Sequence, residues 1–413
     1  MTVCQSFNAK SLIYWLAPVL CVVAFFAVAS AEDLPRLVLN DGKIVSARFL
    51  SFGEEQISYT DDESNLVQSV PIKSVVRWGN LANPITVDQL LLTDGSILIG
   101  RITRVTRDAF VVETDLWGEL TIPRSSLLGA VWRLPTDPTE QWKLRDKITS
   151  GGDSDGLILK NGDVLEGKLL SGSLQIFKLL TATGPVEVKT QAVAAWQRKT
   201  RRIKAIPKGV ICGLSDGTQL FATKLRVDDR IHANLGCGFV VGSLLGIRPA
   251  DERLVSYLRP TKSDVVYLSD LEPIGYKHIP FLKMDWPWQA DRNALRGPLS
   301  SAGGMYYAKG LGMHSTARLA FQLENQFEEF QAEVCLDDSA GQNGSVVFRV
   351  FTFGEPQKWE ETYKSPVVRG GELPRAVRVP LNGATRLALV VDFADRGDVL
   401  DRANWLGARV VGN

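Results

Sequence analysis

Histidine, cysteine and excess charge are all scarce in this sequence. Its 413 residues include 3 His and 5 Cys, and the formal net charge is +1. A structural zinc site needs clustered Cys and His ligands, and no C-x-x-C spacing occurs. Binding of nucleic acid calls for a strongly basic face, which this composition does not indicate. The sequence therefore argues against a zinc-stabilised fold and against a nucleic acid partner.

Long apolar runs are absent except at the N-terminus. There, Lys10 precedes an uncharged apolar stretch, Leu12 to Val28, which ends in Ala29-Ser30-Ala31. This order is typical of a secretory signal peptide over residues 1–31, with cleavage after Ala31. The alternative is an uncleaved membrane anchor, because about 17 apolar residues approach the lower limit for a span. In both cases we expect an exported protein, located in the periplasm, on the cell surface or in the medium.

Disulfide bonds are not expected to form a framework. Removal of residues 1–31 leaves Cys212, Cys237 and Cys335, and an odd number of cysteines in a chain of this length argues against a disulfide-rich fold. Cys212 and Cys237 either pair with each other or are small buried apolar residues. Cys335 lies in an apolar strand pattern, which predicts a core position.

A repeated pattern fills the first half of the chain. Four segments combine an apolar strand, a turn dipeptide and a second alternating strand, and the dipeptides are Asp41-Gly42, Asp94-Gly95, Asn161-Gly162 and Asp216-Gly217. Such dipeptides tolerate the positive φ of type I′ turns and predict β-hairpins. Trp78, Trp132 and Trp196 close the first three segments. We interpret them as core residues, with aromatic platforms for a ligand as the alternative.

The expected organisation is all-β. Repeats 1 and 2 are predicted over residues 32–134, a polar linker over 135–155, and repeats 3 and 4 over 156–255. The repeats form either a string of small SH3-like or Sm-like barrels or strands shared in a larger β assembly. Over 260–413, short alternating strands separated by Gly, Asp and Asn turns predict an antiparallel β-sandwich that folds on its own.

Ordered blocks in the C-terminal region resemble one family. The blocks "YYAKGLGMHSTARLAFQL", "FQAEVCLDDSAGQNGSVVFRVF" and "LALVVDFADRGDVLDRANWLGARVV" are similar to the NPCBM family of carbohydrate-binding modules, roughly from Asp264 to Val411. The resemblance implies a galactose-binding-like β-sandwich that binds glycans, of galactose type among others, without cleaving them. The repeats resemble no family that we can name.

The histidine of the "KGLGMHS" block is the central candidate residue. A role for His314 as a catalytic base is disfavoured, because the adjacent Ser315 points to the opposite side of an extended chain. Two interpretations stay open. In one, His314 caps a tight turn made by the neighbouring glycines. In the other, it binds a sugar hydroxyl while aromatic and amide side chains complete the site, and the predicted carbohydrate-binding residues are then His314, Trp405, Tyr306, Tyr307 and Asn404.

Two further groups are candidates for ligand binding. Trp286 and Trp288 flank Pro287 and either stack on sugars or cover the edge of the sandwich. Four aspartates recur every third residue near the C-terminus, and Ca²⁺ prefers such converging carboxylates; the alternative is a solvated loop. Calcium is the one cofactor we consider, with these ligands: Asp392, Asp395, Asp398 and Asp401.

Three functions are compared on this basis. The first is an exported non-catalytic carbohydrate-binding protein whose repeats act as a spacer or partner surface. The second is a structural protein of the envelope that uses the sandwich to bind envelope proteins. The third is a glycosidase, which is disfavoured because repeats of roughly 50 residues leave no room for a typical barrel of about 250 residues. We predict no catalytic residues, and a membrane partner only if residues 1–31 are retained.

Overall fold

The structure is a computed structural model that describes residues 35–82, 87–150, 154–199, 209–227, 231–242, 254–261, 263–281, 284–323, 327–395 and 397–412. The predicted signal segment, residues 1–31, lies outside the described residues. Within the described part of the chain, no helix has both the length and the apolar character needed to cross a membrane.

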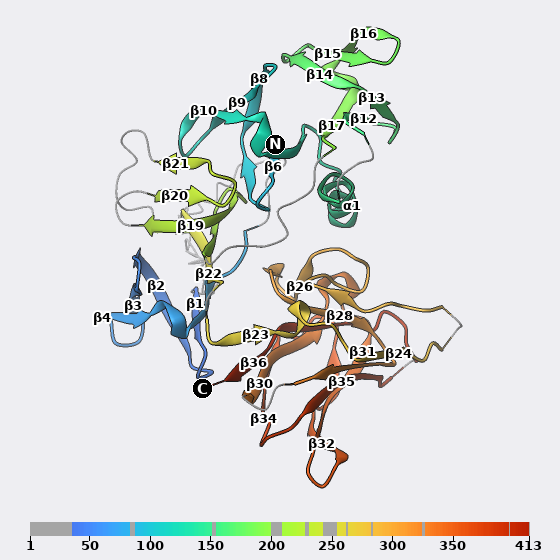
Figure 1. Ribbon diagram of the computed structural model, residues 1–413. Coiled ribbons are helices and arrows are strands. Elements are labelled where there is room, and N and C mark those ends of the chain that lie inside the picture. Colours follow the sequence, from blue (N-terminus) through green and yellow to red (C-terminus); the bar gives the residue numbers. More distant parts are fainter. Residues whose placement is uncertain are drawn as a thin grey trace, which may run out of the picture. The chain divides into compact units, whose positions relative to one another are not determined.

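Strands dominate the described residues between 35 and 260 (Figure 1). Segment 1 comprises β1 (Arg36–Leu39), β2 (Ile44–Phe52), β3 (Gln56–Asp61), β4 (Val67–Pro71), the 3₁₀ helix η1 (Ile72–Ser74) and β5 (Val75–Gly79). Segment 2 comprises β6 (Gln89–Leu92), β7 (Ile97–Ile99), β8 (Arg101–Val105), β9 (Ala109–Thr114), β10 (Gly118–Pro123), η2 (Arg124–Ser126) and β11 (Leu127–Val131). Segment 3 comprises β12 (Gly156–Leu159), β13 (Val164–Glu166), β14 (Lys168–Gly172), β15 (Ile176–Thr181), β16 (Gly184–Lys189), η3 (Thr190–Ala192) and β17 (Val193–Gln197). Segment 4 comprises β18 (Val210–Leu214), β19 (Gln219–Val227), β20 (Ile231–Leu235), β21 (Val240–Gly242) and β22 (Val255–Pro260).

The four segments share strands in one assembly. A 16-stranded sheet contains strands of all four, because β5 pairs with β22, β7 with β19, and β11 with β17. A second sheet of six strands joins segments 2 and 3 through β8 and β14. Of the two predicted architectures, the structure has the larger β assembly. Its order along the sheet is 3, 2, 4, 1, so neighbours in sequence are not always neighbours in space.

The predicted hairpins are present, but their turns are not of type I′. In segment 1 the amide of Gly42 donates to the carbonyl of Leu39, and the amide of Leu39 donates to the carbonyl of Lys43. This is a three-residue loop in which only Gly42, with φ of 81°, is left-handed. The Asp41 side chain accepts from the amide of Lys43 at 2.8 Å. That bond holds the aspartate at negative φ, and it explains the different turn type.

The tryptophans that end the segments belong to the core. Trp78 and Trp196 are buried, and Trp132 is partly buried with its ring 4.6 Å from that of Phe177. The core interpretation therefore describes these residues better than a ligand platform does. Cys212 is buried in the same core, and Cys212 and Cys237 are both free thiols.

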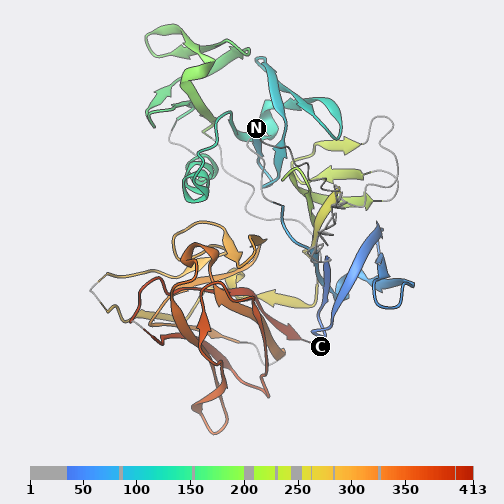
Figure 2. The same cartoon turned by 180° about the vertical axis from the view of Figure 1, so that it is seen from behind.

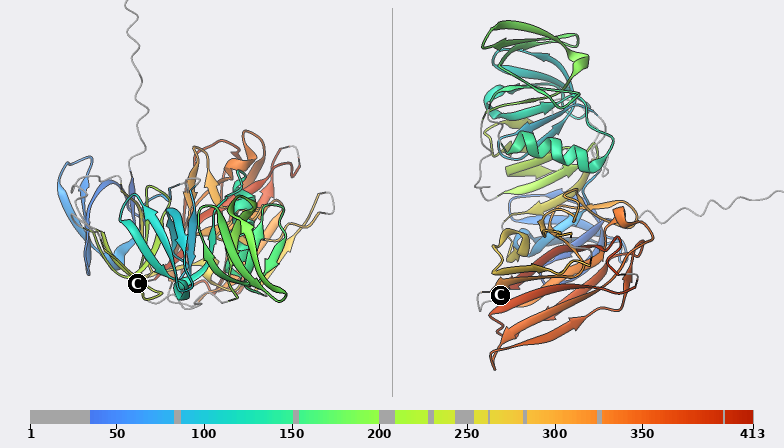
Figure 3. Two further views of the ribbon diagram at one scale, coloured as in Figure 1. Left: turned by 90° about the horizontal axis from the view of Figure 1, so that it is seen from above. Right: turned by 90° about the vertical axis from the view of Figure 1, so that its right-hand side faces the viewer.

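The predicted linker contains a helix. Residues Pro138–Thr149 form α1, the coiled ribbon in Figure 3. It packs against β11 through Ile148. Its N-cap is Asp137, whose carboxylate accepts from the amide of Glu140 at 2.9 Å. Asp137 with Pro138 at the first helical position is a helix start signal in the sequence. The stretch 135–155, predicted as a polar linker between repeats 2 and 3, therefore contains a helix that was not predicted from the sequence.

Two antiparallel sheets face each other in the C-terminal region as a β-sandwich (Figure 2). One sheet contains β23 (Val265–Tyr267), β25 (Gln289–Ala290), β28 (Gly310–His314), β30 (Phe327–Leu336), β34 (Arg375–Pro380) and β36 (Arg402–Gly412). The other contains β24 (Gly275–His278), β29 (Ala317–Gln322), β31 (Ser345–Gly354), β32 (Lys358–Lys364), β33 (Val368–Arg369) and β35 (Arg386–Phe393). The remaining elements are η4 (Leu268–Asp270), η5 (Asp338–Ala340) and a hairpin of β26 (Leu299–Ser301) and β27 (Met305–Tyr307).

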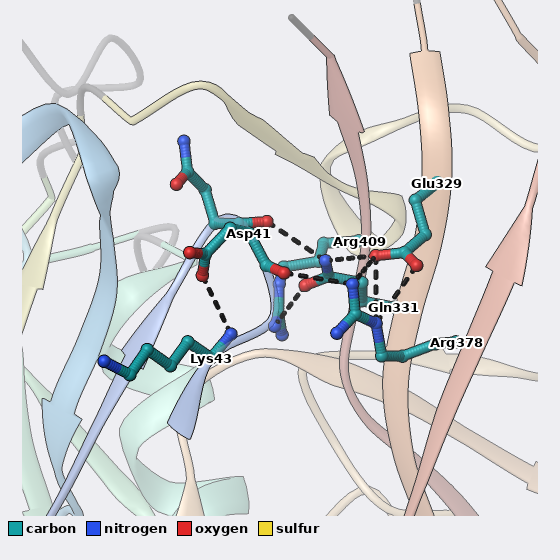
Figure 4. A network of polar contacts seen from close by, with 7 residues as sticks. Asp41, Lys43, Glu329, Gln331, Arg378 and Arg409 are labelled. Carbon is teal, nitrogen blue, oxygen red and sulfur yellow. Dashed lines mark hydrogen bonds and ion pairs between the residues drawn. The ribbon is translucent and has the colours of Figure 1, made fainter. Parts of the chain in front are cut away.

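Polar contacts join segment 1 to the sandwich (Figure 4). Arg378 donates to the carbonyl of Asp41 at 3.0 Å and forms an ion pair with Glu329 at 2.9 Å. Gln331 donates to the carbonyl of Asn40 at 3.0 Å. Asn40 and Asp41 are in the first hairpin turn, so the turn that shapes segment 1 also contacts the sandwich.

Candidate functional site

The residues predicted to bind carbohydrate do not form one site. They lie along β28 and its neighbour β36, which pair in register from Gly310 opposite Leu406 to His314 opposite Arg402. Tyr306 and Tyr307 precede β28, whereas His314 ends it. The two tyrosines and the histidine therefore lie at opposite ends of the strand.

Trp405 and Asn404 are inaccessible to a ligand. The Trp405 ring is fully buried between the sheets, 5.0 Å from the ring of Phe348 at right angles to it. Asn404 is equally buried and donates to the carbonyl of Ser300 and the carboxylate of Asp337. The prediction that Trp405 and Asn404 contact a sugar is wrong, because both side chains are used inside the fold.

His314 is a packed residue at the end of a strand. Its ring is buried and stacks on Trp286 at 4.6 Å, and burial lowers its pKa. The glycines before it do not form a turn, since residues Gly310–His314 are β28. A side chain at Gly312 would lie 2.2 Å from the carbonyl oxygen of Arg292, so the glycine is needed for close approach of two backbones. His314 does make a structural hydrogen bond, with its Nδ1 3.1 Å from the carbonyl oxygen of Ser315, but at the end of a strand and not at a glycine turn. Its burial argues against a sugar contact.

The tryptophans around Pro287 differ in their surroundings. Trp286 is half-buried, and its ring covers His314. Trp288 is also half-buried and packs against the core of the sandwich. Covering the sandwich is the interpretation that fits both positions.

The four aspartates of the predicted calcium site do not converge. Asp392 pairs with Arg349 at 2.8 Å, Asp395 pairs with Arg369 at 2.6 Å, and Asp398 accepts from the amide of Phe281. Among the described residues, no group of three acidic, His or Cys side chains is arranged to hold a metal ion. The prediction of a calcium site at these residues is therefore wrong.

Asp401, the fourth of these aspartates, is a buried structural carboxylate. It accepts from the Ser315 hydroxyl at 2.6 Å and from the Ser345 amide at 2.8 Å. Burial raises its pKa to about 6 despite these bonds, which act in the opposite direction. Asp401 therefore ties the end of β28 to β31.

The two tyrosines line a cleft of about 1190 Å³. One wall comes from the sandwich, and the other from α1, the Asp94-Gly95 turn and the end of β22. The aromatic and charged side chains of the lining are Trp142, Tyr267, Tyr306, Tyr307, Phe221, Asp94, Arg145, Asp146, Arg259, Asp270, Asp291, Arg292 and Lys309. Aromatic faces beside fixed polar groups are what small-molecule and sugar sites require.

Lys309, the lysine of the "KGLG" block, fixes the sandwich wall of this cleft. It is buried, with its Nζ 2.6 Å from an oxygen of Asp270 and 2.7 Å from one of Asp291. The other oxygen of Asp291 accepts from the amide of Gly310 at 3.1 Å. These bonds hold both carboxylates at the start of β28.

Cations cover three of the four large rings beside Tyr306. The guanidinium carbons of Arg145 and Arg292 each lie 5.4 Å from the Trp142 ring, and Arg292 also pairs with Asp146 on α1. Cations likewise lie over two tyrosines, with Arg259 and Lys309 near Tyr267 and Arg77 near Tyr307. In the described part of the chain, no such contact occurs at the half-buried ring of Tyr306. Phe221, the fourth of these rings, is buried, so among the described residues Tyr306 is the partly exposed ring of the cleft that no cation covers.

Most of this cleft was not predicted from the sequence. Trp142, Arg145 and Asp146 fall in the stretch taken for a linker, where the Asp137-Pro138 start signal was the clue to a helix. Arg259 and Arg292 carried no local pattern, because folding alone brings them to the cleft.

A family model matches the sandwich. The matching model is described as the NPCBM/NEW2 domain and covers residues 264–411. These residues form an NPCBM/NEW2 domain. The predicted family resemblance is confirmed, and this domain class is one of carbohydrate-binding modules. The all-β prediction is confirmed as well.

The curated relatives each match about a quarter of this chain. A Renibacterium salmoninarum protein named putative endo-alpha-N-acetylgalactosaminidase is 32% identical over 113 residues, which are 27% of this chain and 7% of that protein. Alpha-1,3-galactosidase B of Akkermansia muciniphila is 33% identical over 110 residues, or 26% of this chain and 13% of that protein. The chain thus spans a small part of the length of both relatives.

Solved structures include similar modules. CBM51 from Clostridium perfringens GH95, solved in complex with methyl-galactose, is 23% identical with a TM-score of 0.31, over 36% of this chain and 99% of that one.

Proposed function

We propose that the protein is an exported, non-catalytic carbohydrate-binding protein that holds a glycan in the cleft beside Tyr306. The observation that supports this function is the partly exposed Tyr306 ring, which lines the same cleft as the fixed carboxylates of Asp270 and Asp291. Segments 1 to 4 then supply the second wall, in addition to acting as a spacer or partner surface. His314 is left out of the proposed site, because its ring is buried.

The chemistry of the cleft suits a sugar. One face of a pyranose presents C–H groups that pack on an aromatic ring, and its edge presents hydroxyls that need oriented donors and acceptors. Tyr306 offers the ring, and Asp291, Arg292 and Gln141 offer polar groups in the same cleft. Because such bonds replace bonds to water, we expect weak binding, with a Kd of about 10 µM to 1 mM.

Two further aspects of the function are proposed from other observations. Similarity to short stretches of an alpha-1,3-galactosidase and of a protein named putative endo-alpha-N-acetylgalactosaminidase supports a galactose-type sugar as ligand. The signal-like pattern of residues 1–31 supports export. N-terminal sequencing of the protein from its native host tests export, and a mature chain that still carries residues 1–31 would indicate an anchor.

A structural protein of the envelope is the second candidate function. Phe281 and Met284, which precede Trp286 in the chain, expose 65% and 63% of their surface. Val399 exposes 60%. Exposed apolar side chains of this size are common where one protein binds another. This candidate predicts binding to envelope proteins and none to glycans.

A glycan array with the chain from residue 32 onward tests the proposal. Tyr306→Ala should weaken binding of the best glycan by about tenfold or more, because it removes the apolar platform. Tyr306→Phe should retain most of the affinity. Trp359→Ala is the matched control, since Trp359 is an exposed aromatic on β32 outside the cleft. An array without any bound glycan would refute the proposed function and leave the envelope candidate.

A further inference from the structure

Arg145 lines the cleft and forms no ion pair with a carboxylate of the described residues. It is buried on α1, and its Nε and Nη2 both donate to a single neutral acceptor, the Oε1 of Gln89, at 3.1 and 2.8 Å. A guanidinium has five N–H donors, so most of its capacity is unused within the described residues. Burial lowers its pKa to about 10, which leaves it charged at neutral pH.

Arg259 lines the same cleft from the end of β22. Its guanidinium carbon lies 5.5 Å from the centre of the Tyr267 ring. No described residue accepts a hydrogen bond from it, and because its Nε is buried, its Nη groups are the donors that a ligand in the cleft would use. Asp270 and Asp291 are near enough to favour its charged form, but neither accepts a hydrogen bond from it. Buried guanidinium groups are costly unless they are paired with an acceptor.

The acidic groups of the cleft are already occupied. Asp146 pairs with Arg292, and Asp270 and Asp291 share Lys309. The remaining carboxylate, Asp94, accepts from the amides of Ser96 and Cys237. The cleft therefore presents unused donors on two arginines and no free carboxylate to match them.

We propose that the glycan bound in the cleft carries a negative charge, a carboxylate or a sulfate ester, that is held by Arg145 and Arg259. This inference rests on the proposed function and specifies its ligand. Planar guanidinium groups pair with carboxylates and with sulfate oxygens through two parallel hydrogen bonds. Such a group would supply the acceptors that both arginines lack, while Tyr306 contacts the sugar ring.

The test compares sugars that differ only in charge. An array of neutral, uronic acid-containing, sulfated and sialylated glycans is probed with the chain from residue 32 onward. Titration calorimetry then compares methyl galactoside with methyl galacturonoside, in which a carboxylate replaces the C6 hydroxymethyl group, and with galactose 6-sulfate. We expect at least one acidic sugar to bind about tenfold more tightly than the neutral one, because charge-assisted hydrogen bonds are the stronger kind.

Variants assign the effect to the arginines. Arg259→Gln should remove most of the preference for the acidic sugar and leave the affinity for the neutral one within about twofold. Arg145→Gln provides an independent second variant, and melting curves check that each is folded. Arg104→Gln removes the same charge from the exposed surface of β8 and should change nothing. The preference should also weaken at high salt, because salt screens charge interactions.

The outcomes separate the two proposals. Binding of neutral glycans with equal or higher affinity than acidic ones would overturn the negative charge but leave the proposed function intact. An acidic preference that survives in both arginine variants would overturn the role of the arginines. No binding across the whole array would overturn the proposed function and this inference with it.

Discussion

Asp401 shows how one buried carboxylate makes the stability of this protein depend on pH. Its pKa is about 6 in the folded protein and near 4 in an unfolded chain. The folded state therefore binds a proton that the unfolded state has lost between these pH values. The free energy of unfolding should fall as the pH rises from about 4 to about 6, since the proton stabilises only the folded state in this window.

We predict that Asp401→Asn removes this slope. Relative to the variant, the wild-type protein should lose stability between pH 4 and pH 6, by about 2 to 3 kcal/mol for a shift of roughly two pKa units. Urea unfolding at several pH values measures the difference. Asp395→Asn, an exposed neighbour paired with Arg369, is the control. Parallel stability curves for wild type and Asp401→Asn would contradict the assignment.

At the scale of single residues, the sequence predicted that aromatic side chains line a binding site, but it did not predict correctly which of them are accessible. Tyr306 and Tyr307 do line the cleft, but Trp405 does not, although it lies on a predicted strand. On β36 both faces are mostly apolar and buried, so alternation along the strand does not indicate which side chains are accessible. His314 was misread because its cover, Trp286, is distant in sequence.

Helix α1 is the element on which the cleft depends most directly. Its side chains Trp142, Arg145 and Asp146 line the cleft, and its start is fixed by the Asp137 cap. Asp137→Ala should lower stability by about 1 kcal/mol, a typical cost of losing a cap. It should also weaken glycan binding, because loss of the cap lets the first turn of α1 unfold, and Trp142, which lines the cleft, lies directly after that turn.

The matched control for the cap is Asp137→Asn. Asparagine also caps helices well, so both stability and affinity should stay near wild type. Chemical denaturation measures the first and titration calorimetry the second. An unchanged free energy of unfolding in Asp137→Ala would show that the cap is not needed.

Among the elements, the hairpins were predicted and the helix was not. Asp-Gly and Asn-Gly dipeptides are strong local signals that need no tertiary information. The turn type still differed, because the aspartate side chain bonds to the backbone two residues ahead. α1 was missed because it is mostly polar, and its packing through Ile148 depends on a strand that the sequence does not place beside it.

The two largest hydrophobic cores of the described residues lie in different parts of the chain. The first contains buried residues between Leu37 and Leu258, and the second contains those between Leu268 and Val410. Polar contacts such as Arg378 with Asp41 and Arg77 with Glu333, together with a small cluster around Tyr267, connect them. Each part has enough buried apolar surface for its own cooperative fold.

We therefore predict that the chain can be divided near residue 261. Residues 260–413 should give a cooperative thermal transition when expressed alone, and so should residues 32–261. The isolated sandwich should bind glycans more weakly than the whole chain, because it lacks the wall formed by α1 and β22. Calorimetric melting and the same glycan titrations measure both. A sandwich that is insoluble alone would contradict independent folding. A sandwich that keeps full affinity alone would contradict the contribution of α1 and β22 to binding.

At the scale of the whole molecule, the spatial order of the four segments in the sheet could not be predicted from the sequence. Four similar hairpin patterns are compatible with many pairings, because each strand edge offers the same backbone donors and acceptors. The pairing of β5 with β22 joins parts of the chain far apart in sequence. The pairing of β5 with β22 is therefore determined by tertiary packing and not by a local sequence signal.

That pairing has a consequence for how the chain is made. Strand β5 leaves the ribosome early, whereas β22 emerges only after segments 2 and 3 and most of segment 4. Until then β5 presents an open edge that other chains can join, and contacts of such high sequence separation form slowly. The nascent protein would depend on a holding chaperone until segment 4 arrives. Loss of segment 4 would leave β5 paired only with β1 and β7 only with β6, each with one open edge, and aggregation would then be the expected fate of the truncated chain.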